Sequence, residues 1–295
     1  MSVRRDVEVA FVGSGPGAAS ITRRLAATFV HTRVFDPWHA ECAAEPIEQT
    51  TVCGSLEELR SHADLVVTLF PTEQALRQVL FEPGGLTAAS RKPLSILELS
   101  PILPWAFQDI VVSCRAAGVF VAGGRLETLS KEGRVWASLH VDDQVRQRSQ
   151  LQFVVEALAD EVVWTGKAGN AKALGTLTDL LVGVNTAVAH EAWEIGQSVG
   201  IDTETLTGLL LKGSGATRVI AQLAALRVPN GGITLDNADQ FSLCAGLQRA
   251  TSAAQHVDHS LFFGSLGVAS LLRHAHPSLR QRPVKAANTQ HASPS

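Results

Sequence analysis

The chain contains no tyrosine and a single methionine, and its four cysteines, Cys42, Cys53, Cys114 and Cys244, form no CxxC pair. The lack of tyrosine excludes a phenolic hydroxyl as a proton donor. Scattered cysteines without paired histidines favour buried thiols in a reducing compartment over disulfides or a zinc site. No metal site is therefore expected.

Long apolar runs and a strong net charge are also lacking. No stretch reaches the roughly eighteen apolar residues that a membrane-spanning helix needs, and MSVRRD leads into a short apolar run, not a signal peptide. A formal net charge of −3 gives no reason to expect nucleic acid or an anionic membrane as a partner. We expect a soluble, cytoplasmic protein.

The first half of the sequence alternates short apolar runs with amphipathic segments. Strands are predicted at 7–13, 32–36, 64–70, 95–100, 118–123, 135–141 and 161–166. Helices are predicted at 16–29, 55–63, 73–81, 104–117 and 145–159. This alternation predicts an α/β fold with a doubly wound, mainly parallel sheet that helices cover on both faces.

After residue 166 only helical patterns remain. Residues 171–200 carry apolar residues every third or fourth position, namely Leu177, Leu181, Val184, Val188, Ala192, Ile195 and Val199. Further helices are predicted from 201 and within 238–274. The division is a dinucleotide-binding Rossmann domain over 1–165, a helical substrate and dimerisation domain over 166–276, and a polar, disordered tail over 277–295.

The segment GSGPGA follows the first strand and opens the first helix, which is the context that a dinucleotide-binding glycine motif requires. Glycines permit the tight turn and the close approach of a pyrophosphate, and the helix N-terminus faces the phosphates. We expect cofactor contacts from Gly13, Ser14, Gly15, Pro16, Gly17 and Ala18.

Asp36 ends the second predicted strand, about twenty residues after the glycines, where a carboxylate binds the ribose 2′-hydroxyl of NAD. It would repel the 2′-phosphate of NADP, and Pro37 and Trp38 supply no arginine to bind one. NAD is therefore favoured. The alternative is that Asp36 only caps the turn before Pro37.

With these motifs in place, the sequence resembles the imine reductase and reductive aminase branch of the β-hydroxyacid dehydrogenase superfamily. The resemblance covers nearly the whole chain and depends on VAFVGSGPGA, DLVVTLFPT, LELSPILP, GGRLETLSKEG, the GNA that opens the long helix, and AGLQ near the C-terminus. It implies a Rossmann domain, a long interdomain helix, a helical C-terminal domain, and a homodimer whose active sites are shared between chains. It also makes NADP possible.

The sequence departs from this family at the residues that carry its chemistry. Imine reductases and reductive aminases keep proton donors on the long helix, at positions that are Gly175 and Gly183 here. The hydroxyacid dehydrogenase lysine is matched only by Lys172, after a shift of about one turn. A Lys-Asp-Leu expected in the last helical region is replaced by AGL at 245–247.

Replacements lie on one face of the long helix, where Lys172, Thr176, Asp179, Gly183, Thr186 and His190 recur at steps of three or four. Asp179 is predicted to be an anionic partner of an iminium or a proton donor. Lys172 is a candidate acid toward a carbonyl oxygen if burial lowers its pKa, although its stem at the helix start can reach solvent. Gly175 and Gly183 are expected to leave room for a substrate. The alternative is that both charges are ordinary surface residues.

Short polar residues at strand ends are secondary candidates. Pro71, Thr72 and Ser100 are predicted at the carboxyl edge of the sheet, where the hydroxyls would meet the nicotinamide or the substrate. Turn formation beside proline explains them equally well. Arg218 is a weaker candidate for a substrate carboxylate, and His256, His259, His274 and His276 lack metal-ligand pairing.

The function predicted from these residues is an NAD(P)H-dependent reductase of the imine reductase type, acting on a small C=N or C=O substrate. An iminium that is already protonated needs no strong acid, so C=N reduction tolerates the missing donors. Two alternatives stay open: a β-hydroxyacid dehydrogenase that uses Lys172, and a degenerate dinucleotide-binding dimer. The apolar stripe from Leu177 to Val199 and the segment 261–272 favour dimerisation.

Overall fold

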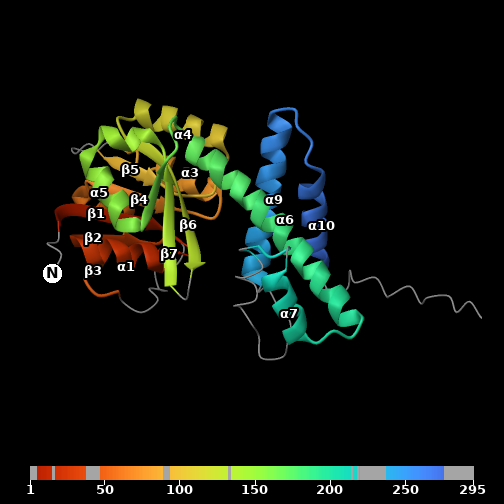
Figure 1. The fold of residues 1–295 in the computed structure, drawn as a ribbon. Helices are drawn as coiled ribbons and strands as arrows, with labels where there is room; N and C mark the ends of the chain where they lie inside the picture. The colour runs from red at the N-terminus through yellow and green to blue at the C-terminus, as the bar shows by residue number, and fades with distance from the viewer. Residues whose placement is uncertain are drawn as a thin grey trace, which may run out of the picture. The chain divides into compact units, whose positions relative to one another are not determined.

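The computed structural model describes residues 5–14, 17–37, 47–88, 94–131, 134–213, 215–217, 219 and 237–275. Its strands are β1 (Arg5–Gly13), β2 (Phe29–Phe35), β3 (Thr50–Val52), β4 (Leu65–Leu69), β5 (Ser95–Glu98), β6 (Phe120–Lys131), β7 (Arg134–Val141) and β8 (Glu161–Trp164). They form one sheet in the order β3-β2-β1-β4-β5-β6-β7-β8 (Figure 1).

Strand directions identify the sheet as a Rossmann sheet with an added edge. Neighbours from β3 to β6 are parallel, β7 is antiparallel to β6, and β8 is parallel to β7. The order reverses between β1 and β4, the switch point at which dinucleotides bind in such sheets. The predicted α/β fold with a doubly wound sheet is confirmed.

Helices cover both faces of the sheet because successive strand residues point to opposite sides. The helices of this unit are α1 (Ala18–Thr28), α2 (Leu56–His62), α3 (Glu73–Phe81), α4 (Pro104–Ala116), the short 3₁₀ helix η1 (Asp143–Gln147) and α5 (Ser149–Leu158). Val9 and Phe11 belong to the core that includes α1 and α5. Ala10 and Val12 belong to the core on the other face, with α2, α3 and α4.

The other helices within the described residues are α6 (Asn170–Ser198), α7 (Thr203–Lys212), α9 (Asn237–His256) and α10 (Phe262–Ala275). The chain divides into two compact units, Met1–Asp179 and Leu180–Ser295, so α6 contributes residues to both. The second unit has its own core, which includes Trp193, Leu206 and Leu247. The helical region predicted over 238–274 is interrupted, because Asp258 adopts a left-handed backbone with φ +53°. The three-region division made from the sequence stays a prediction.

Three cysteines within the described residues are free and buried, as the sequence indicated, namely Cys53, Cys114 and Cys244. Burial raises the pKa of the Cys114 thiol to about 12. Cys42 and the tail over 277–295 lie outside the described residues. Across the part of the chain that is described, no helix is both long and apolar enough to cross a membrane.

Candidate active site

The described ends of the turn between β1 and α1 are compatible with a phosphate-binding loop. The Ser14 N–H donates to the Leu69 carbonyl at 3.1 Å, which joins the ends of β1 and β4. A Cβ on Gly13 would lie 2.2 Å from the same carbonyl oxygen, so a side chain is excluded there. Gly17 has φ +95°, which L side chains rarely adopt. Gly15 and Pro16 lie outside the described residues.

The N-terminus of α1 is suited to bind an anion. Ala18 is the first helical residue, and the N-cap residue, Gly17, has no side chain with which to cap the helix. The first backbone N–H groups of a helix have no intrahelical acceptors and lie at its positive dipole end. The residues present therefore fit the pyrophosphate of a dinucleotide, whose nicotinamide would supply or accept hydride.

Asp36 directly follows β2, at the carboxyl edge of the sheet. A cavity of about 550 Å³ lies beside it, between Phe35 and Pro37, the start of α2, and the end of α3 with the turn that follows. Among the described residues, the charged ones that line this cavity are Glu57 and Glu82, both acidic. A negatively charged cavity fits an uncharged ribose better than a ribose with a 2′-phosphate, because like charges repel. Trp38 lies outside the described residues.

Thr72 and Pro71 lie between β4 and α3. Thr72 is the N-cap of α3, and its hydroxyl oxygen accepts from the Ala75 N–H at 3.2 Å. The role of Thr72 in turn formation, given from the sequence as the alternative, is therefore supported. The hydroxyl still has its own proton, which it can donate to a ligand. Pro71 is exposed beside it.

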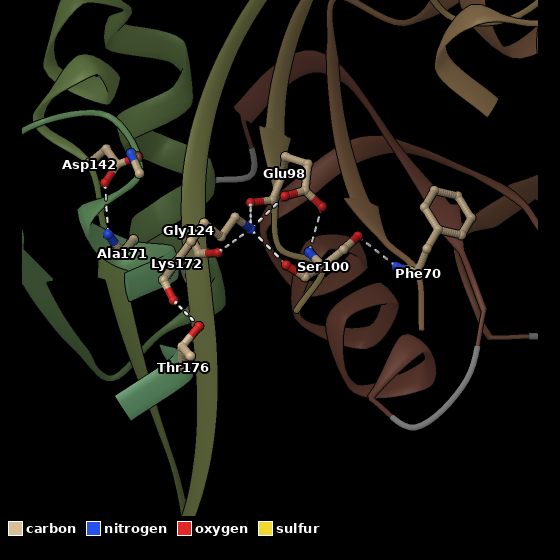
Figure 2. A network of polar contacts seen from close by, with 9 residues as sticks. Phe70, Glu98, Ser100, Gly124, Asp142, Ala171, Lys172 and Thr176 are labelled. Atoms are coloured by element: carbon tan, nitrogen blue, oxygen red, sulfur yellow. Dashed lines mark hydrogen bonds and ion pairs between the residues drawn. The ribbon is translucent and has the colours of Figure 1, made fainter. Parts of the chain in front are cut away.

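Lys172 lies in a buried polar network that joins the start of α6 to the end of β5 and to Gly124 within β6 (Figure 2). Its Nζ donates to the carbonyls of Glu98, Ser100 and Gly124, each at 2.9 Å. The same Nζ forms an ion pair with Glu98 Oε2 at 2.5 Å, and the two side chains are 1% and 0% exposed. Burial lowers the pKa of Lys172, and the Glu98 carboxylate opposes that shift.

Two expectations about Lys172 are therefore wrong. Its stem does not reach solvent, because the side chain is 1% exposed and its Nζ lies against four oxygen atoms. It is also no ordinary surface residue, and neither are Thr176 and Thr186 on the same helix face, which are buried. The side of α6 that is exposed carries apolar residues, such as Leu181, Val188 and Ile195.

Ser100 belongs to the same network. Its hydroxyl oxygen accepts from the Phe70 N–H at 2.9 Å, and its own N–H donates to Glu98 Oε1 at 2.6 Å. Ser100 is fully buried. It ties β4, β5 and α6 together, and Figure 2 displays these contacts side by side.

Asp142, at the end of β7, holds the start of α6. Its carboxylate accepts from the N–H groups of Gly169 at 2.8 Å and Ala171 at 2.9 Å, and from the Thr165 hydroxyl at 3.1 Å. Burial raises the pKa of this carboxyl, and the two backbone donors oppose the shift. The helix that carries Lys172 and Asp179 therefore begins at a fixed place on the sheet.

Asp179 pairs with Arg125, a residue of β6 that the sequence analysis did not single out. Arg125 Nη2 donates to Asp179 Oδ1 at 2.6 Å, with side chains 19% and 13% exposed. In this contact the carboxylate is a hydrogen-bond acceptor. That arrangement fits an anionic partner of an iminium better than a proton donor.

The glycines of α6 make room for side chains of this protein, so the space expected for a substrate at these positions is filled. A Cβ on Gly175 would lie 2.8 Å from Arg125 Cγ, and one on Gly183 would lie 2.5 Å from Leu247 Cγ. Their lack of a side chain is explained by packing. Among the described residues, no group of His, Cys, Asp and Glu is arranged to hold a metal ion. Arg218 and His276 lie outside them.

Sequence reasoning missed Glu98, Arg125 and Asp142. Each is a charged residue at the end of, or just beyond, an apolar strand run, at the edge where a Rossmann fold binds ligands. Their position at this edge of the sheet could have identified them from the sequence as site candidates. Their partners are 74, 54 and 27 or 29 residues distant in sequence, and no local pattern indicates such pairs.

No protein-family model matches the chain. It is 22% identical over 218 residues to 2-(hydroxymethyl)glutarate dehydrogenase of Eubacterium barkeri, which covers 72% of this chain and 71% of that one. The solved structure of Mycobacterium tuberculosis 3-hydroxyisobutyrate dehydrogenase with L-serine has a TM-score of 0.72 at 18% identity, over 92% of this chain and 94% of that one. The imine reductase of Myxococcus stipitatus in complex with NADP⁺ has a TM-score of 0.61 at 14% identity, over 91% and 94%.

Reductive aminase structures are also among the neighbours. The resemblance to the β-hydroxyacid dehydrogenase superfamily, including its imine reductase and reductive aminase branch, is therefore confirmed at the level of fold. Named relatives are dehydrogenases and reductases, and structures of neighbours hold NADP⁺ or NAD⁺.

Proposed function

We propose that the chain is an NAD(P)H-dependent reductase of the imine reductase type that delivers hydride to a small C=N or C=O substrate. The observation that carries the proposal is the engagement of Lys172 with Glu98 and three carbonyls. Oxidation of a hydroxyacid needs a base with a lone pair directed at the substrate hydroxyl. The Lys172 amine donates to three main-chain carbonyls and faces the Glu98 carboxylate, so it directs no lone pair at a substrate hydroxyl and is unsuited to that task.

Asp179 suits the reductive direction. A protonated iminium carries a positive charge that a nearby carboxylate stabilises, and it needs no strong acid before it accepts hydride. The Arg125 guanidinium orients the Asp179 carboxylate at 2.6 Å and is itself seated against Gly175. In this proposal Asp179 binds and orients the cationic substrate, while Lys172 is a structural residue.

The cofactor side of the proposal rests on the turn Gly13–Ala18 and on Asp36. Gly13, Ser14, Gly17 and Ala18 would hold the pyrophosphate, and Asp36 beside an acidic cavity favours NADH over NADPH. A structural neighbour with bound NADP⁺ keeps NADPH as the competing cofactor. Free, buried cysteines support a reducing, cytoplasmic location.

A second candidate is a β-hydroxyacid dehydrogenase. The relative from Eubacterium barkeri is a dehydrogenase of a hydroxymethyl acid, and the Mycobacterium tuberculosis enzyme has a higher TM-score than the imine reductase. In the form predicted from the sequence, with Lys172 as the base, this candidate requires the Lys172 amine to leave its present acceptors. A third outcome, a dinucleotide-binding dimer without turnover, would follow if neither Lys172 nor Asp179 meets a substrate.

One experiment separates the three. Purified protein is assayed for NADH and NADPH oxidation with a methylpyrroline, a small cyclic imine, and for NAD⁺ and NADP⁺ reduction with 3-hydroxyisobutyrate. We expect turnover with the imine. Turnover with the hydroxyacid alone would replace the proposal by the second candidate. Cofactor binding by calorimetry without turnover of either substrate would leave the degenerate binder.

A further inference from the structure

The hairpin β6–β7 extends past the carboxyl edge of the parallel sheet. Glu98, the last residue of β5, pairs with Gly123 of β6, and β6 continues to Lys131. Arg125 and Glu127 therefore lie two and four residues beyond that edge, or about 7 and 13 Å at the usual rise of a strand. In Rossmann folds ligands bind outside this edge.

Charged and titratable side chains gather on one face of this extension. Arg125 and Glu127 are two residues apart on β6, so they share a face, and His140 of β7 is directly opposite Arg125. His140 Nδ1 lies 3.9 Å from Glu127 Oε1, with side chains 18% and 17% exposed. Asp179 joins the group through Arg125.

Three atoms of this group are buried polar atoms without a hydrogen bond to any described residue. They are Arg125 Nε, Glu127 Oε1 and His140 Nδ1. Buried polar groups in proteins are nearly always hydrogen-bonded, and exceptions that cluster at one place call for an explanation such as a catalytic role. Hydrogen bonds of catalytic pairs are often long before substrate binds and shorten in the complex.

We propose that His140 is the proton donor of the reductase and that Glu127 is a positioning residue that orients the imidazole. This inference rests on the proposed function and supplies what the sequence lacks at Gly175 and Gly183. The alternative donors are engaged elsewhere, since Lys172 is bound to Glu98 and Asp179 accepts from Arg125. The inference extends the substrate class from preformed iminium ions to carbonyl compounds, which require a proton.

The step balances as follows. The carbonyl carbon would take the hydride that a reduced nicotinamide supplies when bound, the C=O π electrons would move to oxygen, and that oxygen would take a proton from protonated His140. The products are the alcohol, the oxidised dinucleotide and neutral His140, which regains a proton from water. Glu127 Oε1, 3.9 Å from His140 Nδ1, is placed to orient the ring.

The test compares two substrates of one ring size. Cyclopentanone needs a proton for its oxygen, whereas an N-methylpyrrolinium salt carries a permanent positive charge and needs none. We expect His140→Ala to lower kcat for cyclopentanone by about 10²-fold or more, the scale of a lost general acid, and to leave N-methylpyrrolinium reduction within about twofold. Glu127→Gln should lower the ketone rate by a smaller factor. His62→Ala, on the exposed surface of α2, is the matched control.

A second readout does not depend on turnover. The imidazole ¹⁵N signals of His140, assigned by comparison with His140→Ala, should shift in Glu127→Gln while those of His62 stay in place. Three results would overturn this inference but not the proposed function. They are equal loss of both activities in His140→Ala, no loss of either activity in that variant, and His140 signals that do not shift in Glu127→Gln. A parent protein that reduces only the N-methylpyrrolinium ion also overturns it, because no donor then operates. A parent protein that reduces neither substrate refutes the proposed function and this inference with it.

Discussion

Lys172 Nζ and Glu98 Oε2 lie 2.5 Å apart in an ion pair that is closed to solvent, with side chains 1% and 0% exposed. The pair joins α6 to β5, and the Ser100 and Gly124 carbonyls complete the shell around the ammonium. Removal of one member of such a pair leaves the other charge buried and uncompensated. Replacement of both by neutral residues avoids that penalty.

We therefore expect Lys172→Met to lower the free energy of unfolding by about 3–5 kcal/mol. The double variant Lys172→Met with Glu98→Gln should recover most of the loss. Lys167→Met, a change at an exposed lysine five residues earlier, should alter stability by less than about 0.5 kcal/mol. Urea unfolding of the four proteins measures these values. A double variant as unstable as Lys172→Met would contradict the pairing.

The sequence had instead led us to expect a Lys172 stem that can reach solvent. A lysine at the first turn of a helix usually extends into solvent, and the local pattern gave no reason to bury it. Its partner Glu98 is 74 residues away and ends an apolar strand. Burial of this kind is decided by tertiary packing, which a single sequence does not display.

The sheet and the dinucleotide turn were predictable because their signals are local. Apolar runs of strand length, the glycines at 13, 15 and 17, and the acid at the end of β2 each act through neighbouring residues. Gly175 marks the limit of that reasoning. The sequence identified a missing side chain, but only the structure places Arg125, 50 positions away, in the space.

Cofactor preference is the second test. If Asp36 binds the ribose 2′-hydroxyl, NADH should bind more tightly than NADPH, because the carboxylate repels a 2′-phosphate. Asp36→Ala should narrow the difference between the two Kd values. Asp109→Ala, an exposed acid on α4, is the control and should leave both unchanged. Calorimetric titration gives the constants, and tighter NADPH binding by the parent protein would refute the assignment.

The third test concerns dimerisation. The apolar face of α6 is open in the single chain, with Leu177 56%, Leu181 63%, Val188 59%, Ile195 64% and Val199 68% exposed. A stripe of this length needs a covering surface in water. We expect light scattering to give about twice the 31.4 kDa chain mass. Leu181→Arg with Ile195→Arg should yield monomers, whereas Gln197→Arg should not. A monomeric parent protein at micromolar concentration would refute the interface.

The last prediction concerns Asp179 and separates its role from that of His140. If the carboxylate stabilises a cationic substrate, Asp179→Asn should lower N-methylpyrrolinium turnover by about 10²-fold, the scale of a lost electrostatic contact in a transition state. Affinity for NADH should stay nearly unchanged. Asp143→Asn removes an exposed acid of η1 and is the control. The variant His140→Ala should have the opposite selectivity, with the ketone affected and the iminium spared.

Asp179→Asn leaves the Arg125 charge without this partner, so Asp179→Asn with Arg125→Gln tests whether the loss comes from a displaced guanidinium. Recovery of turnover in that double variant would assign Asp179 to holding Arg125. Persistent loss would assign it to the substrate.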